Sequence, residues 1–230
     1  MTFSYFLTAA KPSDPTLRLD SGQKSQLANA VRMTPGLVRA ELYTPAEVQT
    51  YHRDGSGPML GLRLEFATLP ELESQVCRGG YLYREFGASS FFAQAGMRVD
   101  HQAMLTRNLL RLNSEGLETE LCSYLVHYPG AAENLNDWLG YYLRHHPQIM
   151  REYPSVRQIN VFTRVDWYDD MPWERVDYMQ RNMLSFPSAE ALLAALGSPV
   201  RDKMRADSAS FPAFSGGAMH YPMLTRIITP

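Results

Sequence analysis

The segment His101-Gln-Ala-Met-Leu-Thr-Arg-Asn-Leu109 is followed, 119 residues further along the chain, by His220-Tyr-Pro-Met-Leu-Thr-Arg-Ile-Ile228. Five of the nine aligned positions are identical, including the histidine and the Met-Leu-Thr-Arg core. The same offset aligns Ser4-Tyr5 with Ser123-Tyr124. Because separate segments share one offset, we predict that the chain is a tandem duplication.

Each half alternates short runs rich in strand formers with runs that carry apolar residues at helical spacing. In the first half we predict strands over residues 3–7, 37–43, 59–66 and 97–109, and helices over 22–32 and 70–77. In the second half we predict strands over 120–127, 156–162, 176–186 and 218–228, and helices over 134–144 and 188–196. This βαββαβ order is the ferredoxin-like arrangement.

In a ferredoxin-like unit two helices cover one face of a four-stranded antiparallel sheet, so the other face must be buried by something else. We therefore predict an α+β fold with two repeats, residues 1–112 and 117–230, whose sheets pack together. The connecting segment, residues 110–116, is short, which favours repeats in contact over repeats that are loosely tethered.

Composition narrows the class of partner. The 230 residues are 45% hydrophobic, and 22 Lys+Arg against 24 Asp+Glu give a net charge of −2 with no basic stripe. Nucleic acid and anionic membranes are therefore poor partners. No window approaches the roughly 18 apolar residues of a membrane span, and the first ten residues lack a basic start. We expect a soluble, cytoplasmic protein.

Motifs for bound cofactors are missing from the sequence. Cys77 and Cys122 are too few for a disulfide framework, and no Cys/His spacing predicts a structural zinc site. The sequence contains no Gly-x-Gly-x-x-Gly, no Gly-Lys-Ser/Thr phosphate loop, no Gly-x-Ser-x-Gly and no His-Glu-x-x-His. We expect no nucleotide, flavin or metal cofactor.

The segment Tyr142-Leu-Arg-His-His-Pro-Gln-Ile-Met-Arg-Glu-Tyr-Pro-Ser-Val-Arg157 resembles the dimeric α-β barrel superfamily, in its EthD-like branch. His145-His146-Pro147 matches the His-x-Pro of those proteins, and Pro154-Ser155-Val156-Arg157 matches their turn into the second strand. In the first half, Thr34-Pro35-Gly36-Leu37-Val38-Arg39 matches the same turn. The resemblance implies that the two repeats form, within one chain, the barrel that two subunits usually form.

The resemblance also implies a catalytic role for His145. In similar proteins the matching histidine points into a pocket between helix and sheet and acts as an acid or a base, for which an ordinary pKa of about 6.5 is suited. The alternative is that Arg144, His145 and His146 form a solvated helix end. The offset places Gln26 opposite His145, so a single site in the second half is expected.

Further candidates lie around the same half. The resemblance suggests His220 or Tyr124 as the group that orients the substrate, with His146 and Asn160 as contacts. Arg226, which recurs as Arg107, could bind a carboxylate. Each candidate also has a structural alternative. Tyr124 could be a core tyrosine, Asn160 could face solvent, and Arg226 could form an ion pair. His220 and its counterpart His101 could share a structural role.

The segment Arg164-Val-Asp-Trp-Tyr-Asp-Asp-Met-Pro-Trp-Glu-Arg175 carries Trp167 and Trp173 among four acidic residues. It could cover an aromatic ligand, or it could be a packed excursion between strands. Its counterpart, residues 45–58, contains Tyr51, His52, Arg53 and Asp54 but no tryptophan.

Together these observations favour a cofactor-independent enzyme that performs proton-transfer chemistry, of isomerase, cyclase, lyase or monooxygenase-like type. Its substrate would be a small apolar oxygenated metabolite such as an aromatic, a lactone or a polyketide-like compound. A non-catalytic ligand-binding or accessory protein is the first alternative. Haem binding through His145 or His220 is the second. Assembly into a homo-oligomer stays open.

Overall fold

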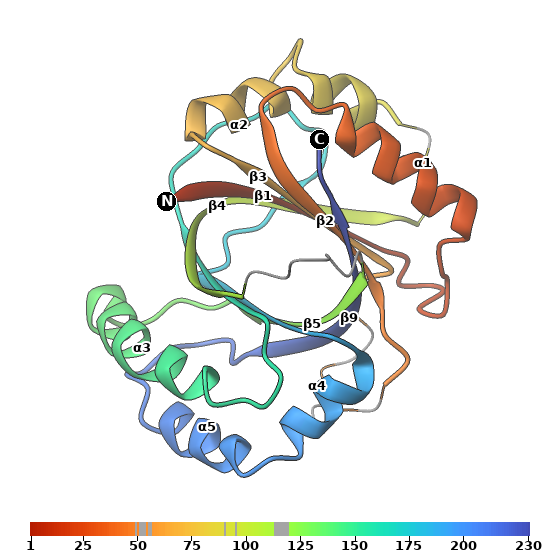
Figure 1. Cartoon of the computed structure of the whole chain (residues 1–230). Helices are drawn as coiled ribbons and strands as arrows, with labels where there is room; N and C mark the ends of the chain where they lie inside the picture. Colours follow the sequence, from red (N-terminus) through yellow and green to blue (C-terminus); the bar gives the residue numbers. More distant parts are fainter. Residues whose placement is uncertain (49, 51–53, 55–56, 90, 95, 113–119) are drawn as a thin grey trace.

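The computed structural model describes the chain except for residues 49, 51–53, 55–56, 90, 95 and 113–119. Its long strands form one closed antiparallel barrel in the order β1-β3-β2-β9-β5-β8-β6-β4, and β4 pairs back with β1. Helices α1 and α2 cover one side of this barrel, and α3, α4 and α5 cover the opposite side (Figure 1). The predicted α+β barrel within one chain is confirmed.

The elements of the first half are β1 (Thr2–Ala10), α1 (Ser21–Arg32), β2 (Leu37–Pro45), β3 (Leu60–Phe66), α2 (Leu69–Val76), the π-helical turn η1 (Tyr83–Gly87) and β4 (Arg98–Arg111). Those of the second half are β5 (Glu120–Tyr128), α3 (Leu135–Met150), β6 (Gln158–Arg164), β7 (Glu174–Arg175), β8 (Gln180–Phe186), α4 (Ala189–Leu196), α5 (Val200–Ser208) and β9 (Met219–Ile228). Every predicted strand and helix is present. The turn η1, the two-residue β7 and helix α5 were not predicted.

Local sequence explains where the first-half helices begin. Asp20 accepts a hydrogen bond from the backbone of Gln23, whose side chain bonds back, so α1 starts with a capping box. Thr68 and Glu71 form the same arrangement at α2. Each cap satisfies backbone donors that the first turn leaves unpaired and stabilises the helix by about 1 kcal/mol.

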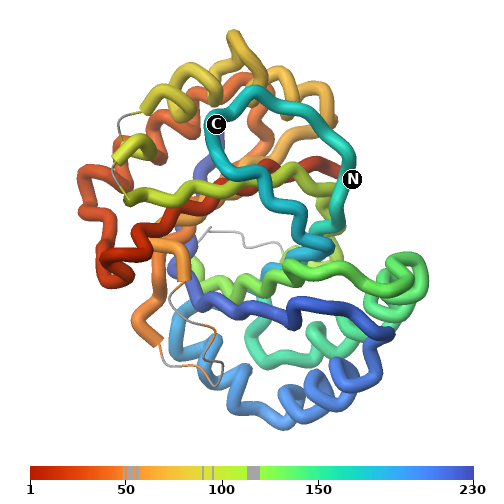
Figure 2. Tube along the Cα trace, turned by 180° about the vertical axis from the view of Figure 1, so that it is seen from behind, coloured from red at the N-terminus to blue at the C-terminus, as the bar shows by residue number. Residues whose placement is uncertain are grey.

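The two four-stranded sheets join edge to edge rather than only face to face. β2 pairs with β9 at one junction, and β4 pairs with β6 at the other. The outer faces of the sheets pack on the helices of their own halves, which gives two separate apolar cores. Figure 2, seen from behind, shows the two helical layers on opposite sides of the barrel. None of the helices in the described part of the chain is long and apolar enough to cross a membrane.

The inner faces of the strands meet inside the barrel. A third apolar cluster lies there, made of Phe6, Tyr43, Met104, Leu125, Phe162, Met183 and Met223. Charged groups share this interior: the guanidinium of Arg63 lies 2.8 Å from Glu41 and 3.3 Å from Glu65. Burial alone would raise the pKa of Glu41, but Arg63 and Arg39 lower it to about 2.

Candidate functional site

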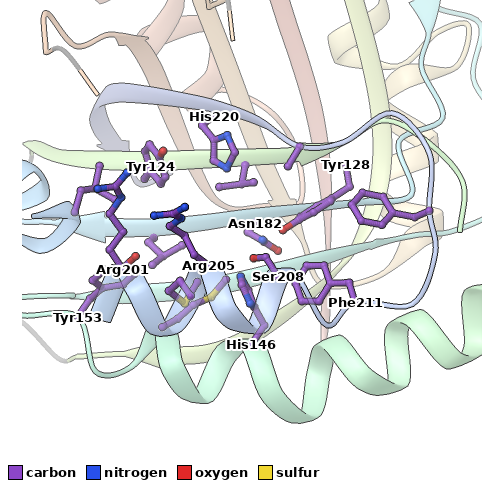
Figure 3. Close-up of a pocket in the computed structure, with 17 residues that line it drawn as sticks. Tyr124, Tyr128, His146, Tyr153, Asn182, Arg201, Arg205, Ser208, Phe211 and His220 are labelled. Carbon is purple, nitrogen blue, oxygen red and sulfur yellow. The ribbon is translucent and has the colours of Figure 1, made fainter. Parts of the chain in front are cut away.

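A cavity of about 370 Å³ lies between the outer sheet face of the second half and helices α3, α4 and α5 (Figure 3). Strands β5, β8 and β9 form one wall, and the helices form the other. The lining is mostly apolar with a small set of polar groups, which is the usual character of a small-molecule site. Its aromatic and polar members include Tyr124, Tyr128, His146, Tyr153, Asn182, Arg201, Arg205, Ser208, Phe211 and His220.

Helical spacing directs His146 into this cavity. The buried residues Trp138, Tyr142, His146 and Met150 recur at every fourth position of α3, so they share the face that packs on the sheet. The Nδ1 atom of His146 lies 2.7 Å from the Oδ2 atom of Asp207, which is on α5. The contact therefore joins two helices.

Asp207 fixes the form in which His146 exists. Its second carboxylate oxygen accepts a hydrogen bond of 3.1 Å from the hydroxyl of Tyr141. Burial lowers the pKa of His146, while the hydrogen bond and charge of Asp207 act in the opposite direction. The net lowering gives a neutral imidazole at pH 7. With Nδ1–H donated to the carboxylate, Nε2 is the basic nitrogen.

A second histidine–aspartate pair stands on the sheet side of the cavity. His220 on β9 places its Nδ1 2.7 Å from Oδ2 of Asp54, and its backbone N–H donates to the same oxygen at 2.8 Å. Asp54 belongs to the β2–β3 connection of the first half, so both halves build this site. The ring of Tyr124 stacks on that of His220 at 5.5 Å between centroids.

Tyr124 offers a buried phenol. Its hydroxyl oxygen is buried and has no hydrogen-bond partner among the described residues. Burial raises the pKa of Tyr124 well above its ordinary value, and the positive charge of Arg201 offsets this only in part. Tyr153, at the same end of the cavity, has its pKa raised to about 12 for the same reason. Both phenols are therefore protonated at neutral pH and can donate hydrogen bonds.

A polar network centred on Asn182 lies at the strand wall of the cavity. The Nδ2 atom of Asn182 donates to the hydroxyl of Tyr142, and its Oδ1 accepts from Gln180 at 3.0 Å. Burial raises the pKa of Tyr142 and of Tyr128. These groups give one wall of the mostly apolar cavity a polar patch whose side chains are fixed by hydrogen bonds.

Two arginines of α5 complete the lining. Arg201 and Arg205 extend from the helix toward β5 and β9 (Figure 3). Arg205 is exposed and Arg201 is half-buried. Guanidinium groups at this position suit a ligand that carries a carboxylate or another electron-rich oxygen.

His145 does not line the cavity. It lies one residue from the buried stripe of α3, which turns it about 100° around the helix axis, and it is exposed. Its ring stacks on Tyr141 at 4.5 Å. His145 therefore occupies the solvated helix position that was considered as the alternative. His146 is the histidine that lies in the space between helix and sheet.

The tryptophans of the long β6–β8 connection lie in the first half. Trp167 packs edge-on against Tyr5 at 6.0 Å and His101 at 5.4 Å. Trp173 packs against Phe92 at 5.3 Å. The connection thus fills the first-half core and does not cover the second-half cavity.

Arg226 and Asn160 also lie away from the cavity. Arg226 lines a separate depression of about 300 Å³ beside α1. Asn160 is fully buried and shares the inward face of β6 with Phe162, so it points into the barrel rather than to solvent. Its side-chain amide has no partner among the described residues.

The first half holds a counterpart of the His220 arrangement. In the ladders His101 pairs with Leu7 and His220 with Val126, so the two histidines occupy equivalent positions. Tyr5 then corresponds to Tyr124, since each lies two residues before that ladder partner.

In this first-half counterpart, side chains fill the space beside the histidine and the tyrosine. The hydroxyl of Tyr5 lies 2.9 Å from Nδ1 of His101, whose Nε2 is 3.8 Å from Asp169. Asp169 belongs to the β6–β8 connection of the second half and lies beside a histidine of the first half. Conversely, Asp54 belongs to the first half and pairs with His220 of the second. The indole of Trp167 occupies the space beside both rings, and burial lowers the pKa of His101.

Sequence reasoning missed the contribution of α5. The last helix predicted from the sequence ends at residue 196, but Pro199 precedes the first turn of a further helix, α5. The spacing of Val200 and Met204, four residues apart, was the available signal. The pairing of Asp54 with His220 had no such signal, and Tyr51, His52 and Arg53 lie outside the described residues.

Comparisons with known proteins define the fold. No family model matches the sequence, and no curated protein matches it. An anthrone oxidase-like protein of known structure is similar over 99% of this chain and 92% of its own, with a TM-score of 0.60 and 12% identity. A monooxygenase candidate from Fusobacterium nucleatum is similar over 99% of this chain and 94% of its own, with a TM-score of 0.58 and 8% identity.

A variant chlorite dismutase from Candidatus Nitrospira defluvii is similar over 96% of this chain and 90% of its own, with a TM-score of 0.53 and 10% identity. All three likenesses extend over nearly the whole chain. The chain therefore has the fold of the dimeric α-β barrel proteins, with both halves of the barrel in one polypeptide.

Proposed function

We propose that the second-half cavity binds a small, mostly apolar, oxygenated metabolite and catalyses proton transfer on it without a bound cofactor. One observation carries this proposal: two histidine–aspartate pairs, His146–Asp207 and His220–Asp54, contribute to the lining of a single apolar cavity. Imidazoles that line an apolar cavity and are each oriented by a carboxylate are suited to general acid–base catalysis.

The environment of each group suggests its role. His146 is neutral with a basic Nε2, so it is the base that removes a proton from the substrate. Tyr124 keeps its proton and can donate to the oxygen on which negative charge develops. His220, beside Tyr124, would return a proton to the product. Arg201 and Arg205 would hold an electron-rich oxygen at the other end of the ligand.

We therefore assign to His146 the role of acid or base that was expected of His145. The wall of the cavity also agrees with the substrate class, because stacked rings and aliphatic side chains bind planar apolar molecules while a few donors orient them. The equivalent positions of His101 and His220 support the origin of the chain by tandem duplication. The EthD-like branch is inferred from the resemblance of His145-His146-Pro147 and Pro154-Ser155-Val156-Arg157.

The neighbouring histidines provide a matched test. Wild type, His146→Gln and His145→Ala would be incubated with anthrone, 1-naphthol and an unsaturated five-membered lactone. Conversion would be followed by liquid chromatography with mass spectrometry, because proton transfer alone gives isomers of equal mass. Loss of a general base lowers turnover by about 10²–10⁴-fold. We expect this loss in His146→Gln and unchanged turnover in His145→Ala, with both variants folded. Full turnover in folded His146→Gln would refute the assignment.

A non-catalytic binding protein is the second candidate, favoured by the same cavity. In that case one of the three compounds would raise the melting temperature of the wild type and of His146→Gln without any product. Haem binding is the third candidate. Of the two histidines considered as haem ligands, His220 lines the cavity and His145 lies outside it. A Soret band after reconstitution, lost in His220→Ala, would support haem.

A further inference from the structure

A buried arginine inside the barrel has no acidic partner. Arg181 lies on β8, where its ladder partners are His127 and Phe162. Only 1% of its surface is exposed. None of the salt bridges between described residues includes it. A guanidinium removed from water without a carboxylate is unusual, because buried charges are normally paired.

The contacts that Arg181 does make leave one edge of its guanidinium unused. Its Nη1 is 3.5 Å from Nε2 of His127. Its guanidinium carbon lies 4.9 Å from the ring centre of Phe6 and 4.5 Å from that of Tyr178. Its Nε and Nη2 have no hydrogen-bond partner among the described residues. Asp100, a carboxylate that raises the pKa of Arg181, is bonded instead to Thr8 and Arg98.

The unused edge is the one that recognises planar anions. Nε–H and Nη2–H point in the same direction and can each donate to one of two oxygens on a single oxyanion. In the barrel, the same edge of Arg39 is occupied by a carboxylate: Nε and Nη2 both donate to Oε1 of Glu41, at 3.2 and 3.1 Å. Arg63 is likewise paired with Glu41 and Glu65. Arg181 has the same donor geometry without the carboxylate.

The unused edge is also held in place. Tyr178, whose ring lies 4.5 Å from the guanidinium carbon, has its backbone bonded on both sides to Gln102, through its carbonyl at 3.0 Å and its N–H at 3.3 Å. The ring of Phe6 is a second contact, at 4.9 Å. Burial lowers the pKa of Arg181 to about 10, so the group still carries its charge at neutral pH. Tyr178 and Tyr221, which both influence that pKa, are only partly buried.

We propose that Arg181 binds a small planar oxyanion, a carboxylate or an inorganic equivalent such as nitrate, inside the barrel through Nε and Nη2. This site is separate from the cavity between sheet and helices, because Arg181 faces inward on β8 while Asn182 faces that cavity. It does not depend on the proposed function of that cavity.

Thermal unfolding in sodium formate, sodium nitrate and sodium chloride at equal ionic strength tests the proposal. Wild type should melt about 3–6 °C higher in formate or nitrate than in chloride when the anion is near ten times its Kd. A rise in melting temperature with formate but not with nitrate would identify a carboxylate site. A rise with nitrate alone would identify a site for an inorganic oxyanion. Arg181→Met should lose the difference. Arg205→Met, which alters the exposed cavity arginine, should retain it.

Without the anions, Arg181→Met should melt at or above the wild-type temperature, because an apolar side chain removes an unpaired buried charge. Arg181→Lys keeps the charge but lacks the planar pair of donors, so it should also lose the formate and nitrate effect. Equal responses of wild type and Arg181→Lys, or no response in wild type, would overturn the proposal.

Discussion

The two halves of the barrel place a tyrosine and a histidine at equivalent positions, yet one pair is packed over and the other faces a cavity. Tyr5 and His101 are hydrogen-bonded at 2.9 Å and covered by the indole of Trp167. Tyr124 and His220 are stacked at 5.5 Å beside a space of about 370 Å³. The same scaffold thus gives a core in one half and a candidate site in the other.

Side chains at equivalent offsets account for this difference. Three polar residues of the cavity align at 119 residues with apolar residues of the first half: His146 with Leu27, Arg201 with Leu82, and Arg205 with Phe86. Each of those apolar residues is buried in the first-half core. Within one topology, a few different side chains on the helical layer therefore accompany a filled space in one half and a cavity in the other.

Removing the indole that fills the first half should have the largest effect on stability. Trp167→Ala deletes a large side chain that is only 8% exposed and leaves a cavity beside Tyr5 and His101. The expected cost is about 3–5 kcal/mol in the free energy of unfolding, measured by urea denaturation. Tyr168→Ala is the control, because its side chain is 64% exposed. Equal effects of the two variants would mean that Trp167 does not fill this space.

Acid should destabilise both halves through their histidines. Burial lowers the pKa of His101 and of His146, so the unfolded chain binds protons at a higher pH than the folded chain does. The free energy of unfolding should therefore fall as pH drops below about 6.5, by up to about 1.4 kcal/mol per pH unit for each histidine.

The same pH series separates the contributions of the halves. His146→Leu places at this position the residue type found at Leu27 and should reduce the slope of stability against pH below 6.5. His145→Ala should leave the slope unchanged, since His145 is exposed. An unchanged slope in His146→Leu would show that the pKa of His146 is not lowered.

The smallest predicted effect comes from the two tyrosine hydroxyls. Tyr5→Phe removes a buried hydrogen bond to His101 and should cost about 1 kcal/mol. Tyr124→Phe removes a buried hydroxyl that has no partner among the described residues, so its cost should be near zero or negative. Equal costs would contradict the distinction between a packed pair and an open one.

The sequence was sufficient to predict the two repeats because the signals were local and repeated, and the resemblance to the dimeric α-β barrel superfamily implied that they close into a barrel. Alternating strands, capped helices and one shared offset specify two βαββαβ units, and each unit has a sheet face that must be buried. Helix α5 escaped prediction because Gly197 and Pro199 resemble a terminus, although Pro199 leads directly into Val200.

The site was predicted less well, and the reason is geometric. The choice between His145 and His146 depends on which one continues the stripe of Trp138 and Tyr142, and that stripe was followed only to residue 144. The place of Trp167 could not be predicted, because the β6–β8 connection crosses to the other repeat, a contact between distant segments that no local pattern encodes.

A crystal structure with bound ligand would show whether the second half carries the working site. The compound among anthrone, 1-naphthol and the lactone that most raises the melting temperature would be soaked into crystals. We expect density between His146 and His220, with Trp167 unmoved in the first half. Density beside Tyr5 and His101, with the second-half cavity lacking the compound, would contradict it.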